Sequence, residues 1–136
     1  MYKYRLIPKL QMRSSNYDEG KMVLVTTIGF KETIEIGDPI SQAKIFDSQS
    51  ADELIFLDLD ASIKRRDTLV KIVRSAAEQI FMPLTVGGGV KRINDFRTLL
   101  GNGADKVSIN TFAIKNPDII NDASKKYGSQ CVVVSI

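Results

Sequence analysis

Short apolar runs alternate along the chain with longer segments in which apolar residues recur at helical spacing. The run at 52–60 has an almost continuous apolar centre, which is typical of a parallel strand covered on both faces. The segment 67–80 that follows it repeats apolar residues every three or four positions, which predicts a helix. This alternation of strand and helix predicts an α/β fold.

The same periodicities predict further elements on both sides of this pair. Strands are predicted at 4–12, 81–86, 104–111 and 130–136, and helices beginning at Pro39, running from Asn94 to Leu100, and running from Asn116 to Tyr127. Asp38 is the predicted N-cap of the first helix, because it directly precedes Pro39 at the first helical position. Pro8 indicates an edge or a bulge for the first strand. Residues 13–20 are polar and predict a loop, and 21–30 predicts a hairpin or irregular strand on that loop, outside the core.

An internal repeat supports this division into elements. Ala51-Asp52 follows the end of one predicted helix, and Ala104-Asp105 follows the end of another at the same spacing. Each copy consists of a helix end, a turn of small residues and the beginning of a strand. A repeated unit of this kind with parallel crossovers leaves two architectures, an open doubly wound sheet and a (β/α)₈ barrel.

Side-chain alternation places charged residues on one face of the predicted sheet. Lys106, Ser108 and Asn110 share a face of their strand, and Arg5 and Glu53 lie on mixed faces where two other strands begin. If the sheet curls with these faces inwards, Arg5, Glu53 and Lys106 surround the same end of a barrel and are expected to pair. The alternative is that all three are solvated charges at the beginning of strands.

Three consecutive glycines, Gly87 to Gly89, stand between a predicted strand and a predicted helix. Glycine lets the backbone approach a ligand closely, and the free N–H groups of a following helix can meet an oxyanion such as phosphate. The motif fits neither the dinucleotide-binding pattern nor the P-loop pattern, so a plain glycine turn is the other interpretation.

Composition excludes several classes of function. The net charge of +3 has acids and bases interleaved, and aromatic residues are few, which argues against a nucleic-acid-binding protein. Histidine is absent, so Ser-His and Cys-His nucleophiles and the commonest zinc ligand are excluded. Cys131 lies in an apolar run, which indicates a buried hydrophobic residue and a reducing cytoplasm. No stretch is long and apolar enough for a membrane span, and no signal peptide, metal or cofactor is expected.

Six motifs together resemble the cyclase subunit (HisF) family of imidazole glycerol phosphate synthase. They are Arg-Leu-Ile-Pro-Lys-Leu at 5–10, Gly-Asp-Pro at 37–39, Ala-Asp-Glu-Leu-Ile-Phe-Leu-Asp at 51–58, Pro-Leu-Thr-Val-Gly-Gly-Gly-Val at 83–90, Gly-Ala-Asp-Lys-Val-Ser-Ile-Asn-Thr at 103–111, and Tyr-Gly-Ser-Gln-Cys-Val-Val-Val at 127–134. The resemblance implies a single domain at 1–136 that forms strands one to five of a (β/α)₈ barrel. It also implies a histidine-biosynthesis synthase of the lyase class, in which a glutaminase partner docked at the barrel floor sends ammonia through the barrel to a phosphorylated substrate at the rim.

The resemblance also implies roles for individual residues. By resemblance, the residues that bind a substrate phosphate are Gly88, Gly89, Asn110 and Thr111, and those that form an ammonia gate are Arg5, Glu53 and Lys106. Asp105 would contact the glutaminase. Asp58 and Asp60 would be carboxylates at the rim, although the family usually has threonine at the position of Asp60.

Two departures from the family's pattern qualify these expectations. Gln11 stands where the family has a catalytic aspartate, and Thr26 stands where it has a loop lysine. The family's second catalytic aspartate would follow Ile136, so this polypeptide is expected to be about half a barrel without cyclase activity. With the motif at 57–62, the departures are similar to a HisF-like branch that makes acetamidino sugars for surface polysaccharides. Two further alternatives are a non-catalytic half-barrel that binds the glutaminase, and a folded fragment of a longer, truncated protein. Because a half-barrel has unpaired strand edges, self-association or a supplied second half is expected.

Overall fold

The computed structural model describes residues 3–60 and 66–136. The strands are β1 (Lys9–Ser14), β2 (Met22–Ile28), β3 (Glu32–Gly37), β4 (Leu54–Asp58), β5 (Leu84–Gly87), β6 (Lys106–Ile109) and β7 (Val132–Val134). The helices are α1 (Pro39–Ser48), α2 (Arg66–Gln79), α3 (Ile93–Gly101), α4 (Thr111–Lys115), α5 (Asp118–Tyr127) and the short 3₁₀ helix η2 (Ser129–Cys131).

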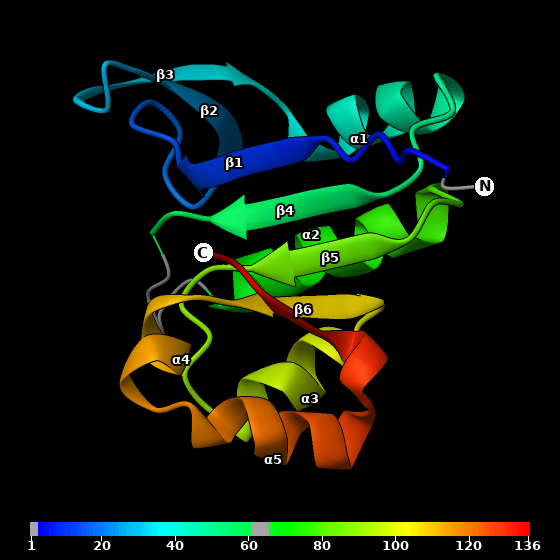
Figure 1. The fold of residues 1–136 in the computed structure, drawn as a ribbon. Coiled ribbons are helices and arrows are strands. Elements are labelled where there is room, and N and C mark those ends of the chain that lie inside the picture. The colour runs from blue at the N-terminus through cyan, green and yellow to red at the C-terminus, as the bar shows by residue number, and fades with distance from the viewer. Residues whose placement is uncertain (1–2, 61–65) are drawn as a thin grey trace.

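All seven strands of the described residues join one sheet in the order β3-β2-β1-β4-β5-β6-β7. Strands β1, β4, β5, β6 and β7 are parallel and follow one another in chain order, and β2 and β3 form an antiparallel hairpin beside β1. Right-handed crossovers between strands in sequential order place their helices on one face, as Figure 1 shows for α2, α3 and α5. This is the arrangement of part of a (β/α) barrel, and it excludes the doubly wound sheet, whose strand order reverses.

The core lies between the sheet and these helices. Phe56, Val86 and Val107 are in register on β4, β5 and β6, and none of the three has any exposed surface. Phe96 of α3 and Val73 of α2 are likewise fully buried. Burial of each such side chain contributes about 1.5–3 kcal/mol, so this layer holds the strands in place.

The sequence repeat is also a repeat of hydrogen bonds. The amide of Asp52 donates to the Leu6 carbonyl at 3.0 Å, and the Asp52 carboxylate accepts from the Leu6 amide at 2.7 Å. Asp105 makes the same pair of contacts with Leu84, at 2.8 and 2.7 Å. Asp52 therefore fixes the segment that leads into β1, and Asp105 fixes the start of β5, which explains why Ala-Asp recurs at this point.

The predicted start of α1 is confirmed. The carboxylate of Asp38 accepts a hydrogen bond from the Ser41 amide at 2.8 Å, and Pro39 occupies the first helical position. The cap satisfies one of the free N–H groups of the first turn.

The first strand differs from its prediction. β1 begins at Lys9 instead of Tyr4 and has β4 on one side and β2 on the other, so it is not an edge strand along its whole length. Pro8 precedes the regular ladder, because proline has no N–H to donate, although its carbonyl still accepts from Ile55 at 2.9 Å.

The prediction that 21–30 lies outside the core is wrong. Met22 and Leu24 are almost completely buried, and Leu24 pairs with Met12 of β1. Antiparallel pairing with β1 carries these side chains onto the same face as the core, which local sequence does not reveal. The turn of the hairpin is exposed, and Phe30 at its tip has 98% of its surface exposed.

The last third of the chain contains smaller differences. The strand predicted to reach Thr111 ends at Ile109, and Thr111 instead begins the short helix α4. The final strand is reduced to β7, and Cys131 is half-buried in η2 instead of buried in a strand. No helix in the described ranges is long and apolar enough to cross a membrane.

We predict that Gly88→Ala destabilises the chain and that Gly101→Ala does not. Gly88 has a φ of +106°, and an added Cβ would overlap the backbone carbonyl of Asp58. The expected loss in the free energy of unfolding is about 3 kcal/mol.

Gly101 is the matched control, because it ends α3 with open space where a Cβ would lie. Alanine there should stabilise by roughly 0.4–1 kcal/mol. Urea denaturation measures both changes, and a Gly88→Ala variant as stable as the unmodified chain would contradict the prediction.

Candidate functional site

Strand register defines the inner face of the sheet, opposite the helices. One row across this face consists of Lys9, Ile55, Thr85 and Lys106. The next row towards the carboxyl ends of the strands consists of Gln11, Leu57, Gly87 and Ser108. Because the strands are parallel, polar groups of different strands meet at the two ends of this face.

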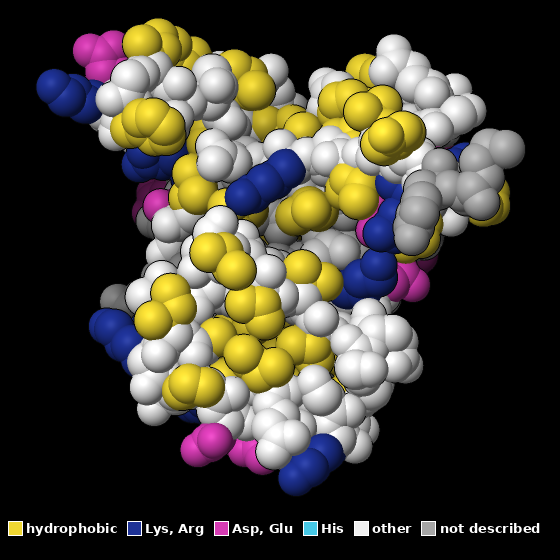
Figure 2. Space-filling model, viewed as in Figure 1, with side chains coloured by type: hydrophobic (Ala, Val, Ile, Leu, Met, Phe, Trp, Pro, Cys, Tyr) yellow, Lys and Arg dark blue, Asp and Glu magenta, His cyan; other side chains and the backbone are white. Residues whose placement is uncertain are grey.

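A charge cluster occupies the amino end of the face. Arg5 Nη1 lies 2.6 Å from Glu53 Oε1, and Lys106 Nζ lies 3.3 Å from both carboxylate oxygens of Glu53. The three residues precede β1, precede β4 and begin β6, so the Arg5 contact joins neighbouring strands and the Lys106 contact reaches across β5. Figure 2 shows Lys or Arg and Asp or Glu side chains together at this end of the molecule. The residues are paired, and the alternative of separate solvated charges does not hold.

Burial explains why Glu53 has two cationic partners. Its side chain is only 11% exposed, compared with 28% for Lys106 and 58% for Arg5. A carboxylate removed from water needs hydrogen-bonded cations to remain charged. Lys106 is the better shielded partner, whereas solvent weakens the contribution of the more exposed Arg5.

A cavity of about 290 Å³ lies at the opposite end of the face and is called the phosphate cavity below. Its lining includes all four residues expected to hold phosphate, which are Gly88, Gly89, Asn110 and Thr111. The half-buried glycines have no side chains that would shield their backbone N–H groups, while Asn110 and Thr111 are exposed and bring an amide and a hydroxyl. These are neutral donors suited to a phosphate oxygen.

Gln11 and Thr26 line a second, smaller cavity of about 200 Å³ between β1 and β2. Gln11 is half-buried and Thr26 is exposed. Neither of these two side chains exchanges a proton near neutral pH, so Gln11 and Thr26 can position a ligand but cannot act as a general acid or base.

The two rim carboxylates lie where β4 ends. Asp58 is 4% exposed, and its Oδ1 accepts a hydrogen bond from the Asp60 amide at 2.9 Å. Asp60 Oδ2 accepts from the Ser14 amide at 2.7 Å, which ties the end of β4 to the end of β1. Residues 61 and 62 of the motif at 57–62 lie outside the described residues. Asp105 lies at the other end of the sheet, exposed beside the start of β6.

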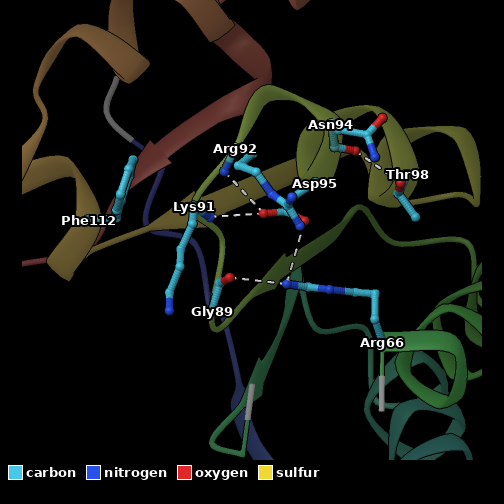
Figure 3. A pocket seen from close by; sticks show the side chains of 8 residues that line it. All are labelled: Arg66, Gly89, Lys91, Arg92, Asn94, Asp95, Thr98 and Phe112. Carbon is cyan, nitrogen blue, oxygen red and sulfur yellow. Dashed lines mark hydrogen bonds and ion pairs between the residues drawn. The ribbon is translucent and has the colours of Figure 1, made fainter. Parts of the chain in front are cut away.

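The sequence did not predict a further cavity of about 440 Å³, called the basic cavity below (Figure 3). Its lining includes Arg66, Lys91 and Arg92. Arg66 Nη2 donates to the Gly89 carbonyl at 3.1 Å and lies 3.8 Å from Asp95 Oδ1. The signal in the sequence was the pair of basic residues that follows the glycines after one valine. Within the described ranges, no group of three or more His, Cys, Asp or Glu residues could hold a metal ion.

Comparison of the sequence with known proteins shows the family of this chain. The family model described as histidine biosynthesis protein matches residues 5–136. The imidazole glycerol phosphate synthase subunit HisF of Methanococcus vannielii is 50% identical over 97% of this chain and 46% of the relative. HisF of Methanocaldococcus jannaschii is 49% identical over the same shares, and HisF of Flavobacterium johnsoniae is 48% identical over 97% of this chain and 50% of the relative.

The chain spans about half the length of these curated relatives. The family match covers the charge cluster, the glycine loop and all five parallel strands. The chain therefore belongs to the histidine biosynthesis protein family, and its predicted resemblance to HisF is confirmed.

Proposed function

We propose that this chain is the ammonia-accepting part of a HisF-like synthase subunit. In this proposal a glutaminase docks at the amino end of the sheet, and ammonia passes along the inner face to a phosphorylated substrate. The observation that carries the proposal is the placement of two different polar sites at opposite ends of one sheet face. The charge cluster lies at one end, and the phosphate cavity lies at the other.

The charge cluster suits a gate. Glu53 is held by one cation that precedes β1 and one at the start of β6, so the contacts close the amino end of the face while they are intact. Arg5 is the most exposed member, and its contact with Glu53 can break at small cost because water replaces it. Movement of Arg5 would open a passage while Lys106 still neutralises Glu53.

The phosphate cavity suits the receiving end. A phosphate seated on Gly88, Gly89, Asn110 and Thr111 would hold a substrate above the inner face, where ammonia arrives. Asp58 and Asp60 lie at the same carboxyl end and connect β4 with β1. The proposed role of Asp105 is contact with the glutaminase, which agrees with its exposure at the amino end.

Gln11 favours a second candidate function, delivery of ammonia without ring closure. Gln11 and Thr26 share one cavity at the positions where the family has an acid and a lysine. A chain that keeps the gate and the phosphate cavity but lacks this acid fits the branch that makes acetamidino sugars. It also fits a non-catalytic half-barrel that only binds the glutaminase.

We expect the chain to bind and stimulate the glutaminase subunit of a HisF-type synthase. The measurement is glutamine hydrolysis at increasing concentrations of the chain. Asp105→Asn should raise the concentration needed for half-maximal stimulation about tenfold, because a charged contact is lost. The asparagine oxygen can still accept from the Leu84 amide, so the fold is preserved.

Asp122→Asn is the matched control, because it removes the same charge from an exposed position on α5. This control should leave stimulation unchanged. Absence of both binding and stimulation by the unmodified chain would overturn the proposed function.

We predict that this 136-residue polypeptide forms no imidazole glycerol phosphate from the phosphorylated substrate and ammonium. The physical reason is that the amide of Gln11 cannot exchange a proton near neutral pH. Chromatography of the reaction mixture measures the product, with the HisF of Methanocaldococcus jannaschii as positive control. Product above the background without protein would refute this prediction.

We also predict that the chain self-associates through β7. This strand ends the sheet in the described residues, and Val134 on it is 43% exposed. An unpaired edge beside the hydrophobic side chains in Figure 2 favours strand addition.

Light scattering tests the association. Val134→Lys should lower the average mass because a charge on the edge opposes pairing. Phe81→Lys, at an exposed apolar residue before β5, should not lower it. A monomer at all concentrations would argue against association.

A further inference from the structure

The basic cavity has the features of a second ligand site. Its volume of about 440 Å³ lies within the usual range of small-molecule sites. It is formed by the start of α2, the loop after β5, the first two turns of α3 and Phe112 of α4. Figure 3 shows Arg66 reaching in from one side and the segment from Lys91 to Thr98 on the other.

Positive charge dominates this cavity. Arg66, Lys91 and Arg92 line it together with a single acidic residue, Asp95. Asp95 already accepts hydrogen bonds from the amides of Lys91 and Arg92 at 2.9 and 3.1 Å, which closes the first turn of α3. Three cations therefore face one carboxylate in the lining of this cavity, and the excess of positive charge favours an anionic ligand.

The cations differ in their availability to a ligand. Arg66 is committed in part to Gly89 and Asp95, although its Nη1 is buried without a hydrogen-bond partner among the described residues. The side chains of Lys91 and Arg92 are exposed, and neither makes a hydrogen bond or ion pair within the described part of the chain. Lys91 and Arg92 are therefore the groups that would contact an anion first.

The basic cavity adjoins the phosphate cavity. Gly89, Lys91 and Phe112 line both cavities, so the two share a wall. In Figure 3 the amino group of Lys91 points away from Asp95. Lys91 is thus positioned between two anion sites, one with neutral donors and one with cationic donors.

We propose that the chain binds a ligand with two adjacent phosphate groups, such as a diphosphate ester. One phosphate occupies the phosphate cavity, the second occupies the basic cavity beside Arg92, and Lys91 interacts with both. This inference rests on the proposed function for its first phosphate and names the substrate class. A lysine suits the shared position because its compact charge can serve two phosphates, whereas arginine suits a terminal phosphate that it contacts with two donors.

Isothermal titration calorimetry with inorganic phosphate and with pyrophosphate tests the proposal. At constant low salt, pyrophosphate should bind at least about tenfold more tightly than inorganic phosphate, since its second phosphate adds charge-assisted hydrogen bonds in the basic cavity. Arg92→Gln should remove most of this advantage and change phosphate affinity less than about twofold, because it lines only the basic cavity. Lys91→Gln should weaken both ligands, and Thr111→Val should weaken phosphate.

Arg97→Gln is the matched control, because Arg97 is an exposed residue on α3 that lines neither cavity. It should leave both affinities unchanged. Equal binding of phosphate and pyrophosphate, or an equal loss in the Arg92 and Arg97 variants, would overturn the second phosphate site and leave the proposed function intact. Pyrophosphate binding that depends on Arg92 but not on Thr111 would support the basic cavity and instead refute the phosphate cavity. Absence of binding by both probes would overturn both sites.

Discussion

Parallel register between neighbouring strands is the constraint on which this structure depends. Because β1, β4, β5 and β6 run in one direction, their amino ends meet at one edge of the sheet and their carboxyl ends at the other. Arg5, Glu53 and Lys106 lie together at the amino ends of the strands, and the glycine loop and Thr111 lie together at the carboxyl ends. A change of register by one residue would turn the charged side chains towards the helices, where no partners for them exist in the core.

Much of this arrangement could be predicted from the sequence. The apolar centre of β4, the spacing in α2 and the Asp38 cap are local signals, and the structure contains all three elements. The contacts of Glu53 followed from strand alternation together with one assumption, that the sheet curls with its mixed faces inwards. The repeated Ala-Asp pair had a physical cause that the sequence alone did not give, namely a carboxylate that binds a backbone amide just before or at the start of an adjacent strand.

The features that were missed depend on contacts between distant segments. Met22 and Leu24 are buried because β2 pairs with β1, and nothing near 21–30 specifies that partner. The basic cavity needs Arg66 from α2 beside a loop more than twenty residues later, so its cations do not form a motif in the sequence. The extent of β1 also differs from the prediction, since the predicted strand includes Pro8 and regular pairing begins only after it.

The hairpin of β2 and β3 has a consequence for any polypeptide that completes the barrel. Its pairing with β1 uses the backbone of that strand from Gln11 to Ser14, so Lys9 and Leu10 are the residues of β1 without a β2 partner. Each edge of a strand can bond to one neighbour at a time. A strand that closes the barrel can therefore pair only with the amino-terminal part of β1, before Gln11. It has to bend away from β1 at Gln11, and the hairpin then forms the barrel wall beside the carboxyl-terminal part of β1.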